Sequence, residues 1–275
     1  MTERIMTVEG RVPLTRRPWI RTTLPIVIFL LALGAWEAVV RINQIPHYIL
    51  PAPSLIATTL WDNFGSLLGS WMFTIKITFW ALALAVVGGV LLAMLFAMSE
   101  WVELSLFPFA IVLQVTPVIS IAPLIIIFVP STTAALLLCA WIVAFFPILS
   151  NTVMGLRSAD LNLRDLFSLY RASPWQTLRH LLIPSALPYF MAGLKVAGGL
   201  SLIGAVVAEF TAGAAGKETG LASRILEASF RTEIPKMFAA LVLVSLTGIA
   251  IYLIFNVLSR LLLGKWHESE VKTDR

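Results

Sequence analysis

Charged side chains within the apolar runs are the first residues whose chemistry needs explaining. The candidates for a chemical role are Glu37, Lys76, Lys195 and Glu209. Charged groups in membrane segments often relay protons or pair with ions, so this set could serve transport driven by an ion gradient. Lys195 and Glu209 are fourteen residues apart, about 21 Å along a helix, and cannot pair within one chain. No carboxylate falls in the middle of a run, which favours structural roles at interfaces or against other helices.

Polar side chains also accompany Pro117 and Pro123 in the run 104–129. The residues of interest are Gln114, Thr116, Pro117 and Ser120. A proline leaves backbone carbonyls free, and membrane proteins tolerate such breaks where they face protein or a water-filled cavity. Thr116 and Ser120 share a helix face because they are four residues apart. We expect this face to line a path for a solute, with a kinked packing helix as the alternative.

The residue pattern gives no support for metal, nucleotide or covalent chemistry. The single cysteine, Cys139, lies in an apolar run, so neither a disulfide within the chain nor a cysteine metal site is expected. The histidines are far apart, at positions 47, 180 and 267. Neither Gly-Lys pair, at 216–217 or 264–265, belongs to the glycine-rich loop that holds nucleotide phosphates. We expect no catalytic residues, no cofactor and no metal.

The composition is that of a helical membrane protein. Of the 275 residues, 59% are hydrophobic and 13% charged, and the mean hydropathy is +0.90. A typical soluble domain is about 45–50% apolar and about 25% charged. This excludes intrinsic disorder, nucleic-acid binding as a main role, and an ordinary water-soluble enzyme. At about 20 residues per spanning helix, the chain has room for about five to seven spans and no separate soluble domain.

Apolar runs separated by prolines, glycines and charges predict six membrane-spanning helices. The third and fourth runs are divided only at Pro130-Ser131-Thr132, because one helix of about 50 residues would overshoot a bilayer. The first run is expected to be an uncleaved signal-anchor, since further spans follow it. The expected domains are a basic tail (1–23), one transmembrane domain (24–264) and a short tail (265–275). The six runs are 24–40, 71–98, 104–129, 132–155, 187–210 and 236–262.

The basic residues of the loops predict the orientation. Six spans bring both termini to one side. Twelve lysines and arginines fall in the two tails and the loop after the fourth span, against four in the opposite loops. Such an excess marks the cytoplasmic side. We therefore expect a multi-pass inner-membrane protein, embedded in the lipid bilayer, with both termini in the cytoplasm. Nucleic acid is the less favoured partner of the basic tail.

The loop at 156–183 is too polar to span a membrane and too regular for a plain linker. Ser158 or Asp160 can cap a helix start. An apolar stripe follows at helical spacing, formed by Leu163, Leu166, Phe167 and Tyr170. Ser173-Pro174-Trp175-Gln176 then matches a capping box, which predicts a second short helix that ends before Pro184. We expect a protruding elbow that either lies on lipid headgroups or docks a cytoplasmic partner.

This elbow resembles the EAA loop of the permeases of ATP-binding-cassette (ABC) importers. The resemblance rests on the stretch that starts Asp165-Leu-Phe-Ser-Leu-Tyr-Arg-Ala-Ser-Pro-Trp-Gln and on Leu-Ile-Pro-Ser-Ala-Leu-Pro at 182–188. It is close to the branch for nitrate, sulfonates, taurine and pyrimidine-type thiamine precursors. It covers about residues 50–264. Further matches in the same order are Leu-Pro-Ala-Pro-Ser at 50–54, Phe-Phe-Pro-Ile-Leu-Ser-Asn-Thr at 145–152, Gly-Leu-Lys at 193–195 and Val-Val-Ala-Glu at 206–209.

The resemblance implies an all-α, type I importer-like permease of about six helices that works by alternating access. ATP hydrolysis would occur on a separate cytoplasmic ATPase dimer. The other implied partners are an extracytoplasmic substrate-binding protein, which would hold most of the selectivity, and a second permease chain, expected to be identical. An ion-driven secondary transporter or channel is the alternative, and it has no need of the elbow. The implied ATPase-coupling residues are Asp165, Leu166, Phe167, Tyr170, Arg171, Ala172, Ser173, Trp175 and Pro184.

The elbow departs from the family pattern at three places. Asp165 stands where the family usually has Glu, and Leu166 and Phe167 replace two alanines. Phe167 and Tyr170 are therefore expected to fill the ATPase groove more deeply than alanines would. Arg171 replaces the glycine that usually turns the chain. A residue with a side chain costs about 1–2 kcal/mol in a left-handed conformation, so either this turn is not left-handed or the chain tolerates strain.

The remaining expectations concern small residues and the outer face. Gly193 and Ala197 have the spacing that lets membrane helices approach closely. Residues 51–61 are expected to form a capped amphipathic helix on the outer membrane face. A flexible turn at 211–216 should precede a helix at 221–230. Contact with a binding protein and ordinary connecting structure both remain open for these outer segments.

Overall fold

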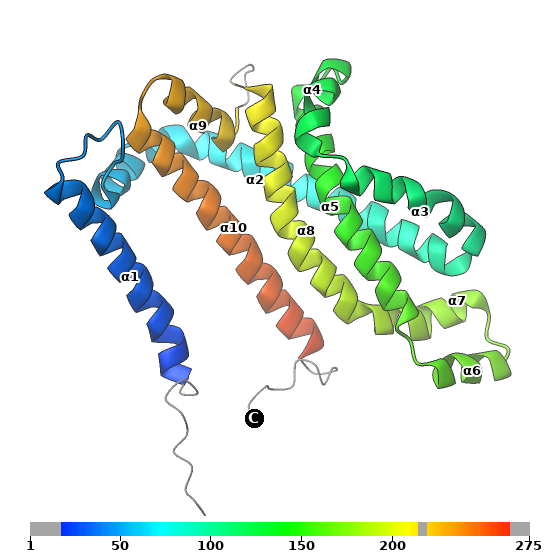
Figure 1. The fold of residues 1–275 in the computed structure, drawn as a ribbon. Helices are drawn as coiled ribbons and strands as arrows, with labels where there is room; N and C mark the ends of the chain where they lie inside the picture. Colours follow the sequence, from blue (N-terminus) through cyan, green and yellow to red (C-terminus); the bar gives the residue numbers. More distant parts are fainter. Residues whose placement is uncertain (1–17, 214–218, 265–275) are drawn as a thin grey trace, which may run out of the picture.

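The computed structural model describes residues 18–213 and 219–264, and the regular structure in these ranges is helical (Figure 1). Five helices are long and apolar enough to cross a membrane, and one bent pair can give a sixth span. The all-α membrane fold of about six helices is confirmed. The elements are α1 (Pro18–Ile42), α2 (Pro53–Met98), α3 (Glu100–Val115), α4 (Val118–Phe128), α5 (Thr132–Arg157), α6 (Leu161–Leu169), α7 (Pro174–Thr177), a π turn η2 (Leu178–Leu182), α8 (Ile183–Ala212), α9 (Leu221–Phe230) and α10 (Ile234–Leu263).

Some expectations fall on residues outside the described ranges. They concern most of the basic tail (1–17), the second tail (265–275) and the end of the outer turn (214–216). The first helix begins at Pro18 rather than at residue 24, so it takes in the end of the basic tail.

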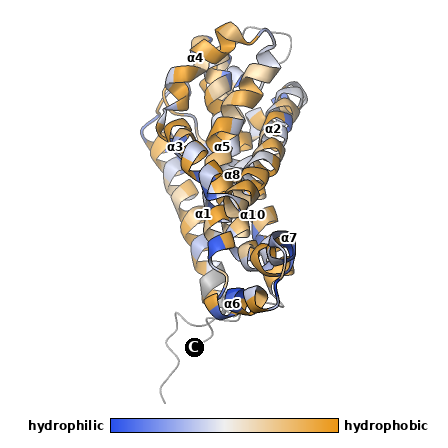
Figure 2. Cartoon of the chain, turned by 90° about the vertical axis from the view of Figure 1, so that its right-hand side faces the viewer, coloured by the Kyte–Doolittle hydropathy of each residue, from blue (hydrophilic) through white to orange (hydrophobic). Residues whose placement is uncertain are grey.

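The long helices form one bundle with two distinct ends (Figure 1). The start of α1 and the end of α10 lie at the same end as α6 and α7, whereas α4 and α9 lie at the opposite end. Figure 2 shows apolar residues along the long helices and hydrophilic residues gathered around α6 and α7. The hydrophilic residues therefore gather at the elbow end, whereas α4 at the opposite end is apolar.

The second span belongs to a much longer helix than expected. α2 has 46 residues, so the outer amphipathic helix and the span 71–98 are one continuous element. At 1.5 Å per residue it is about 69 Å long, more than twice the hydrocarbon thickness of about 30 Å. It runs obliquely across the bundle (Figure 1). The prediction of a separate surface helix is wrong because no proline follows Pro53 in α2, and the glycines at 65 and 69 do not interrupt a helix.

The third span breaks at the prolines more sharply than a kink. α3 and α4 differ in direction by 101°. Pro117 has no N–H to donate and keeps the preceding residue out of the helical conformation. Thr116 is accordingly extended, with φ −74° and ψ 119°. α4 is thus a short separate helix rather than the second half of a straight span.

Close packing of α5 against α8 forms the centre of the bundle. A Cβ at Gly193 would lie 2.8 Å from the carbonyl oxygen of Pro147, and a Cβ at Gly204 would lie 2.8 Å from the Cα of Ala140. Only glycine permits these approaches, which confirms the expected role of small residues. In contrast, the apolar side chains of α1 are largely exposed, so they do not pack into the bundle.

Candidate functional site

The break between α3 and α4 opens a cavity of about 520 Å³ against α5 and α8. Three of the four residues expected to line a path, Gln114, Thr116 and Pro117, line this cavity. Ser120 does not belong to its lining and is exposed on α4. The Thr116 hydroxyl donates to the carbonyl of Val112 at 2.7 Å, which satisfies the last turn of α3. The structure therefore brings the proline break and its polar residues together in one hollow.

The cavity offers hydrogen bonds but no charge. Its polar side chains are Gln114 and Thr116, and its remaining lining is apolar, with Phe146 and Ile203 as examples from α5 and α8. The Leu113 carbonyl also lacks its usual helical donor, because Pro117 has no N–H. A small ion stripped of water would find no counter-charge among these residues, whereas a neutral polar solute would find partners.

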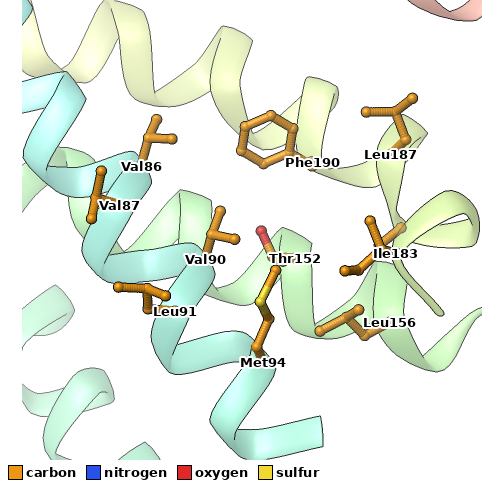
Figure 3. Close-up of a pocket in the computed structure, with 11 residues that line it drawn as sticks. Val86, Val87, Val90, Leu91, Met94, Thr152, Leu156, Ile183, Leu187 and Phe190 are labelled. Carbon is orange, nitrogen blue, oxygen red and sulfur yellow. The ribbon is translucent and has the colours of Figure 1, made fainter. Parts of the chain in front are cut away.

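A second hollow of about 440 Å³ lies between α2, α5 and α8 and is apolar (Figure 3). Val90 and Met94 approach it from α2, and Phe190 from α8. Its one side-chain hydroxyl, on Thr152, donates to the carbonyl of Ile148 at 2.6 Å. This hollow suits hydrocarbon and offers no means to recognise a polar solute.

Two helix caps and a left-handed turn at Arg171 hold the elbow in shape. The Asp160 carboxylate caps α6 by accepting from the N–H groups of Asn162 at 2.7 Å and Leu163 at 3.3 Å. Of the two expected caps, Asp160 is therefore correct, and Ser158 ends α5 instead. At α7 the expected capping box is present, with Gln176 accepting from the Ser173 N–H at 2.8 Å.

Arg171 adopts the left-handed conformation, with φ 51°. Its N–H donates to the carbonyl of Ser168, and the N–H of Ala172 donates to the carbonyl of Phe167, both at 2.9 Å. This pair of bonds is the Schellman motif that usually places glycine at this position. Of the two possibilities left open for this turn, the chain therefore keeps the left-handed turn and tolerates the strain of an arginine.

Most of the coupling residues expected in the elbow are exposed. Tyr170 and Trp175 expose 80% and 58% of their surface, and Asp165 and Leu166 are exposed as well. Phe167 is half-buried, so it projects less than expected. Leu169, which the apolar stripe left out, exposes 80% of its surface. The sequence pattern missed Leu169 because this residue lies off the helical spacing of the stripe.

The prediction that the second short helix ends before Pro184 is wrong. α7 continues through the π turn η2 into α8, and together they form a helix of 39 residues. The Ile183 N–H donates to the carbonyl of Leu178, five residues back. This wider turn accommodates a proline that an α-helical turn would resist. The elbow is therefore joined directly to α8.

Two arginines tie the elbow to other helices. The Arg164 side chain on α6 donates to the carbonyl of Leu156 at 2.8 Å, near the end of α5. Arg157, at the end of α5, forms an ion pair with Glu103 of α3. These two arginines and Glu103 border a polar hollow of about 400 Å³. Sequence reasoning missed the pair because Glu103 and Arg157 are 54 residues apart.

The two carboxylates of the apolar runs both cap helices. Glu37 accepts from the backbone N–H of Ser54 at 3.0 Å, in the first turn of α2. Glu209 accepts from the N–H of Ala222 at 2.9 Å, in the first turn of α9. Among the basic residues, Lys195 donates to Asn256 at 3.5 Å. Lys76 is exposed in the middle of α2, because this helix begins at Pro53 and not at residue 71. The four charged groups therefore do not form one ion-binding site.

Comparison with known proteins decides the family. Residues 85–265 match the sequence model of the binding-protein-dependent transport system inner membrane component. The chain belongs to this family. The permease is 34% identical over 264 residues to the riboflavin transport system permease protein RibX of Chloroflexus aurantiacus, covering 93% of this chain and 94% of the relative. It is 32% identical over 247 residues to the formylaminopyrimidine transport permease protein ThiX of Halalkalibacterium halodurans, covering 90% and 96%.

The fold of the permease has a solved counterpart. An amino acid ABC transporter crystallised with histidines matches with a TM-score of 0.60 and 16% sequence identity, covering 76% of this chain and 97% of the other. At this identity the match concerns the fold. The expected resemblance to ABC permeases is confirmed, and the chain is a multi-pass inner-membrane permease of an ABC importer for a small solute.

Proposed function

We propose that two copies of this permease form the solute path of an importer, with the α6–α7 elbow docked on cytoplasmic ATPases. The α4–α9 end then faces a substrate-binding protein, and both termini are cytoplasmic. The observation that carries this proposal is the elbow itself. It is a capped, strained and largely exposed structure that joins directly to α8, which lines the cavity at the α3–α4 break.

The elbow has the properties of a coupling element rather than of a lipid-bound hairpin. Its apolar side chains Leu166, Leu169 and Tyr170 stand on a short helix whose two ends are fixed by hydrogen bonds. A rigid helix in a groove can transmit a push, whereas a loose hairpin would absorb it. Because α7 and η2 continue into α8, closure of the ATPase dimer would move the cavity wall.

The contacts of Glu37 and Glu209 argue against the alternative of an ion-driven transporter or channel. Glu37 and Glu209 were its candidate coupling groups, and each is engaged in capping the first turn of another helix. A carboxylate that takes up and releases an ion during transport would break such a cap in every cycle. The caps therefore favour structural roles for both residues.

The cavity favours a neutral, hydrogen-bonding solute over an inorganic anion. An ion without a counter-charge is costly to remove from water, and the cavity lining carries no charged residue. Relatives named for riboflavin and formylaminopyrimidine transport handle ring compounds with several hydrogen-bonding groups. We expect this permease to carry a ring compound of that kind.

Uptake by the native complex in proteoliposomes tests the substrate class. Labelled riboflavin and a formylaminopyrimidine are offered in separate assays, with nitrate and taurine as the anionic comparisons. ATP-dependent uptake of a ring compound supports the assignment. Uptake of nitrate or taurine alone would contradict it, and the importer mechanism would stand.

A pair of substitutions on α6 tests the coupling role. Leu166 lies on the predicted docking stripe, and Leu161 lies on the opposite face; both are exposed, at 44% and 74%. Leu166→Asp should abolish solute-stimulated ATP hydrolysis and leave the permease in the membrane, because a charge would enter the ATPase groove. Leu161→Asp is the matched control and should keep more than about half of the stimulation. Equal stimulation in both variants would contradict the coupling role.

A further inference from the structure

Glu209 is the most deeply buried acidic residue of the described chain, with 1% of its surface exposed. One carboxylate oxygen accepts from the Thr74 hydroxyl of α2 at 2.8 Å, and the other accepts from the Ala222 N–H of α9 at 2.9 Å. No basic side chain contacts it within residues 18–213 and 219–264. Its described partners are thus neutral and come from two other helices.

The residues at the start of α9 pack closely against the Glu209 carboxylate. A Cβ at Gly220 would lie 2.1 Å from the Glu209 carboxylate, so any side chain there would displace the carboxylate from its position. The Thr74 oxygen also accepts from the Leu221 N–H at 2.9 Å. Thr74 and Glu209 together therefore satisfy the first two N–H groups of α9, which its N-cap residue Gly220 cannot do.

A second contact joins α9 to α2. The Arg224 side chain donates to the Ser70 hydroxyl at 3.0 Å, one turn of α2 before Thr74. Arg224 also donates to Glu227 at 2.8 Å, and this hydrogen bond, with the nearby charge of Arg231, lowers the pKa of Glu227 below its ordinary value. The charged residues of α9 thus pair with one another beside α2, while the first turn of α9 is buried.

The same helix that carries Glu209 forms a wall of the cavity. Val207, Gly204 and Ile203 line the cavity and lie two, five and six residues before Glu209 on α8. Between Glu209 and these residues α8 is a regular helix. Any displacement of α9 that is transmitted to Glu209 therefore reaches the cavity wall within two turns.

Capping alone does not explain why the carboxylate is buried. Glu37 caps α2 by the same chemistry while its side chain stays 22% exposed. Glu209 instead has both of its carboxylate oxygens hydrogen-bonded to other helices inside the fold, and a buried polar group that loses its partner is costly. The buried arrangement makes the junction of α2, α8 and α9 stiff.

We propose that Glu209 is a positioning residue that fastens the outer helix α9 to α8 and α2, so that contact of the binding protein with α9 moves the cavity wall as one body. This inference rests on the proposed function, because it takes α9 to face the binding protein. The exposed end of α9, where Phe230 is 81% exposed, is the part left free for that contact.

Spin labels on Ser229→Cys and Ile203→Cys in one chain of the complex measure whether α9 and the cavity wall move together. With Glu209 present, we expect one narrow distance, unchanged between the nucleotide-free complex and the complex trapped with ATP and vanadate. In Glu209→Ala we expect a broadened distance and at least a tenfold loss of uptake. Hydrolysis of ATP without solute should stay within about twofold, since the elbow lies at the other end of the bundle.

Thr74→Val and Gly220→Ala extend the test in case Glu209→Ala fails to assemble. The first removes one hydrogen bond, and the second pushes the carboxylate away, so both should broaden the distance. Glu233→Ala is the matched control, because Glu233 is exposed and pairs only with Lys236 among the described residues. Glu209→Gln keeps one acceptor oxygen and should recover part of the lost uptake.

Three results would overturn the role of Glu209. They are a distance that changes with nucleotide state in the native chain, a narrow distance in Glu209→Ala, or normal uptake in that variant. Failure of the proposed function would give a different pair of results. In that case no ATPase accompanies the native chain, and a maleimide that cannot cross the membrane labels Thr116→Cys equally with and without ATP.

Discussion

Glu103 and Arg157 form an ion pair that links α3 to the end of α5, although they are 54 residues apart in sequence. Arg157 lies next to Leu156, whose carbonyl accepts from Arg164 of the elbow. The elbow is therefore connected to α5, and α5 to α3, at the end opposite the α3–α4 break. The end of α3 forms part of the cavity wall. The ion pair therefore connects the elbow to the cavity through α5 and α3, in addition to the connection through α8.

Exchange of the two charges tests that route. We expect Glu103→Arg and Arg157→Glu each to lower uptake at least fivefold, because like charges would face one another at the elbow. The double variant should recover most of the uptake. The Arg157 side chain is 63% exposed, and exposed pairs contribute only about 0–1 kcal/mol, so thermal stability should hardly change. Uptake in proteoliposomes and thermal unfolding are the measurements.

Glu100→Arg is the control for this exchange, since Glu100 borders the same hollow and lies one turn before Glu103. It should keep more than half of the native uptake. A double variant as inactive as the single variants would show that the charges matter separately, and not as a pair.

Two glycines of α8 should respond oppositely to alanine. At Gly193 a Cβ would lie 2.8 Å from α5, whereas at Gly199 it would meet nothing within 4 Å. We expect Gly193→Ala to destabilise the fold by about 1–3 kcal/mol through overpacking. Gly199→Ala should be neutral or stabilise it by up to about 1 kcal/mol, because alanine is the better helix former.

The buried Cys139 provides the measurement for these glycine variants. Its side chain is fully buried in α5, so a thiol-reactive dye reports its exposure as the protein unfolds. The midpoint of dye reaction should fall for Gly193→Ala and stay or rise for Gly199→Ala. Equal midpoints would contradict the close packing of α5 and α8.

Arg171→Gly should stabilise the elbow slightly. Relief of the left-handed arginine gains about 1–2 kcal/mol, and the greater freedom of glycine in the unfolded chain offsets about 0.4–1 kcal/mol of that. Hydrogen exchange of the Ala172 amide, which donates to Phe167, should be slower in Arg171→Gly. Arg171→Ala is the control and should show no gain. Faster exchange in the glycine variant would show that the arginine itself stabilises the turn.

Substitutions of Thr116 and Ser120 should affect uptake differently, although the sequence pattern places both residues on one helix face. Thr116 lines the cavity and Ser120 does not. Thr116→Leu adds volume there and removes the bond to Val112, so we expect at least a fivefold loss of uptake with normal membrane insertion. Ser120→Leu should keep most of the uptake. Unchanged uptake in Thr116→Leu would remove this cavity from the solute path.

Local sequence patterns predicted the elbow and the proline break. Asp160, Ser173 and Pro117 act on residues one to four positions away, and such short-range chemistry is visible in a sequence. The same patterns failed where geometry depends on distant partners. The π turn that absorbs Pro184 has no local signal in the sequence. The unbroken length of α2 had one, the lack of a proline after Pro53, but the length limit of a single span outweighed it.

The charged residues of the apolar runs show the same limit. The sequence singled out Glu37 and Glu209, and it correctly excluded a pair between Glu209 and Lys195. It could not show that each carboxylate caps a helix, because the capped residues Ser54 and Ala222 lie 17 and 13 positions further along the chain. The cavity itself could be expected only in part, since its α5 and α8 walls adjoin the proline break only in the fold.

Purification of the tagged permease from its native membrane in a mild detergent tests the central claim most directly. The account predicts that an ABC ATPase accompanies the permease in a fixed ratio, and that Leu166→Asp loses this ATPase while Leu161→Asp keeps it. A permease that purifies without an ATPase, and that transports in vesicles on an ion gradient without ATP, would contradict the account.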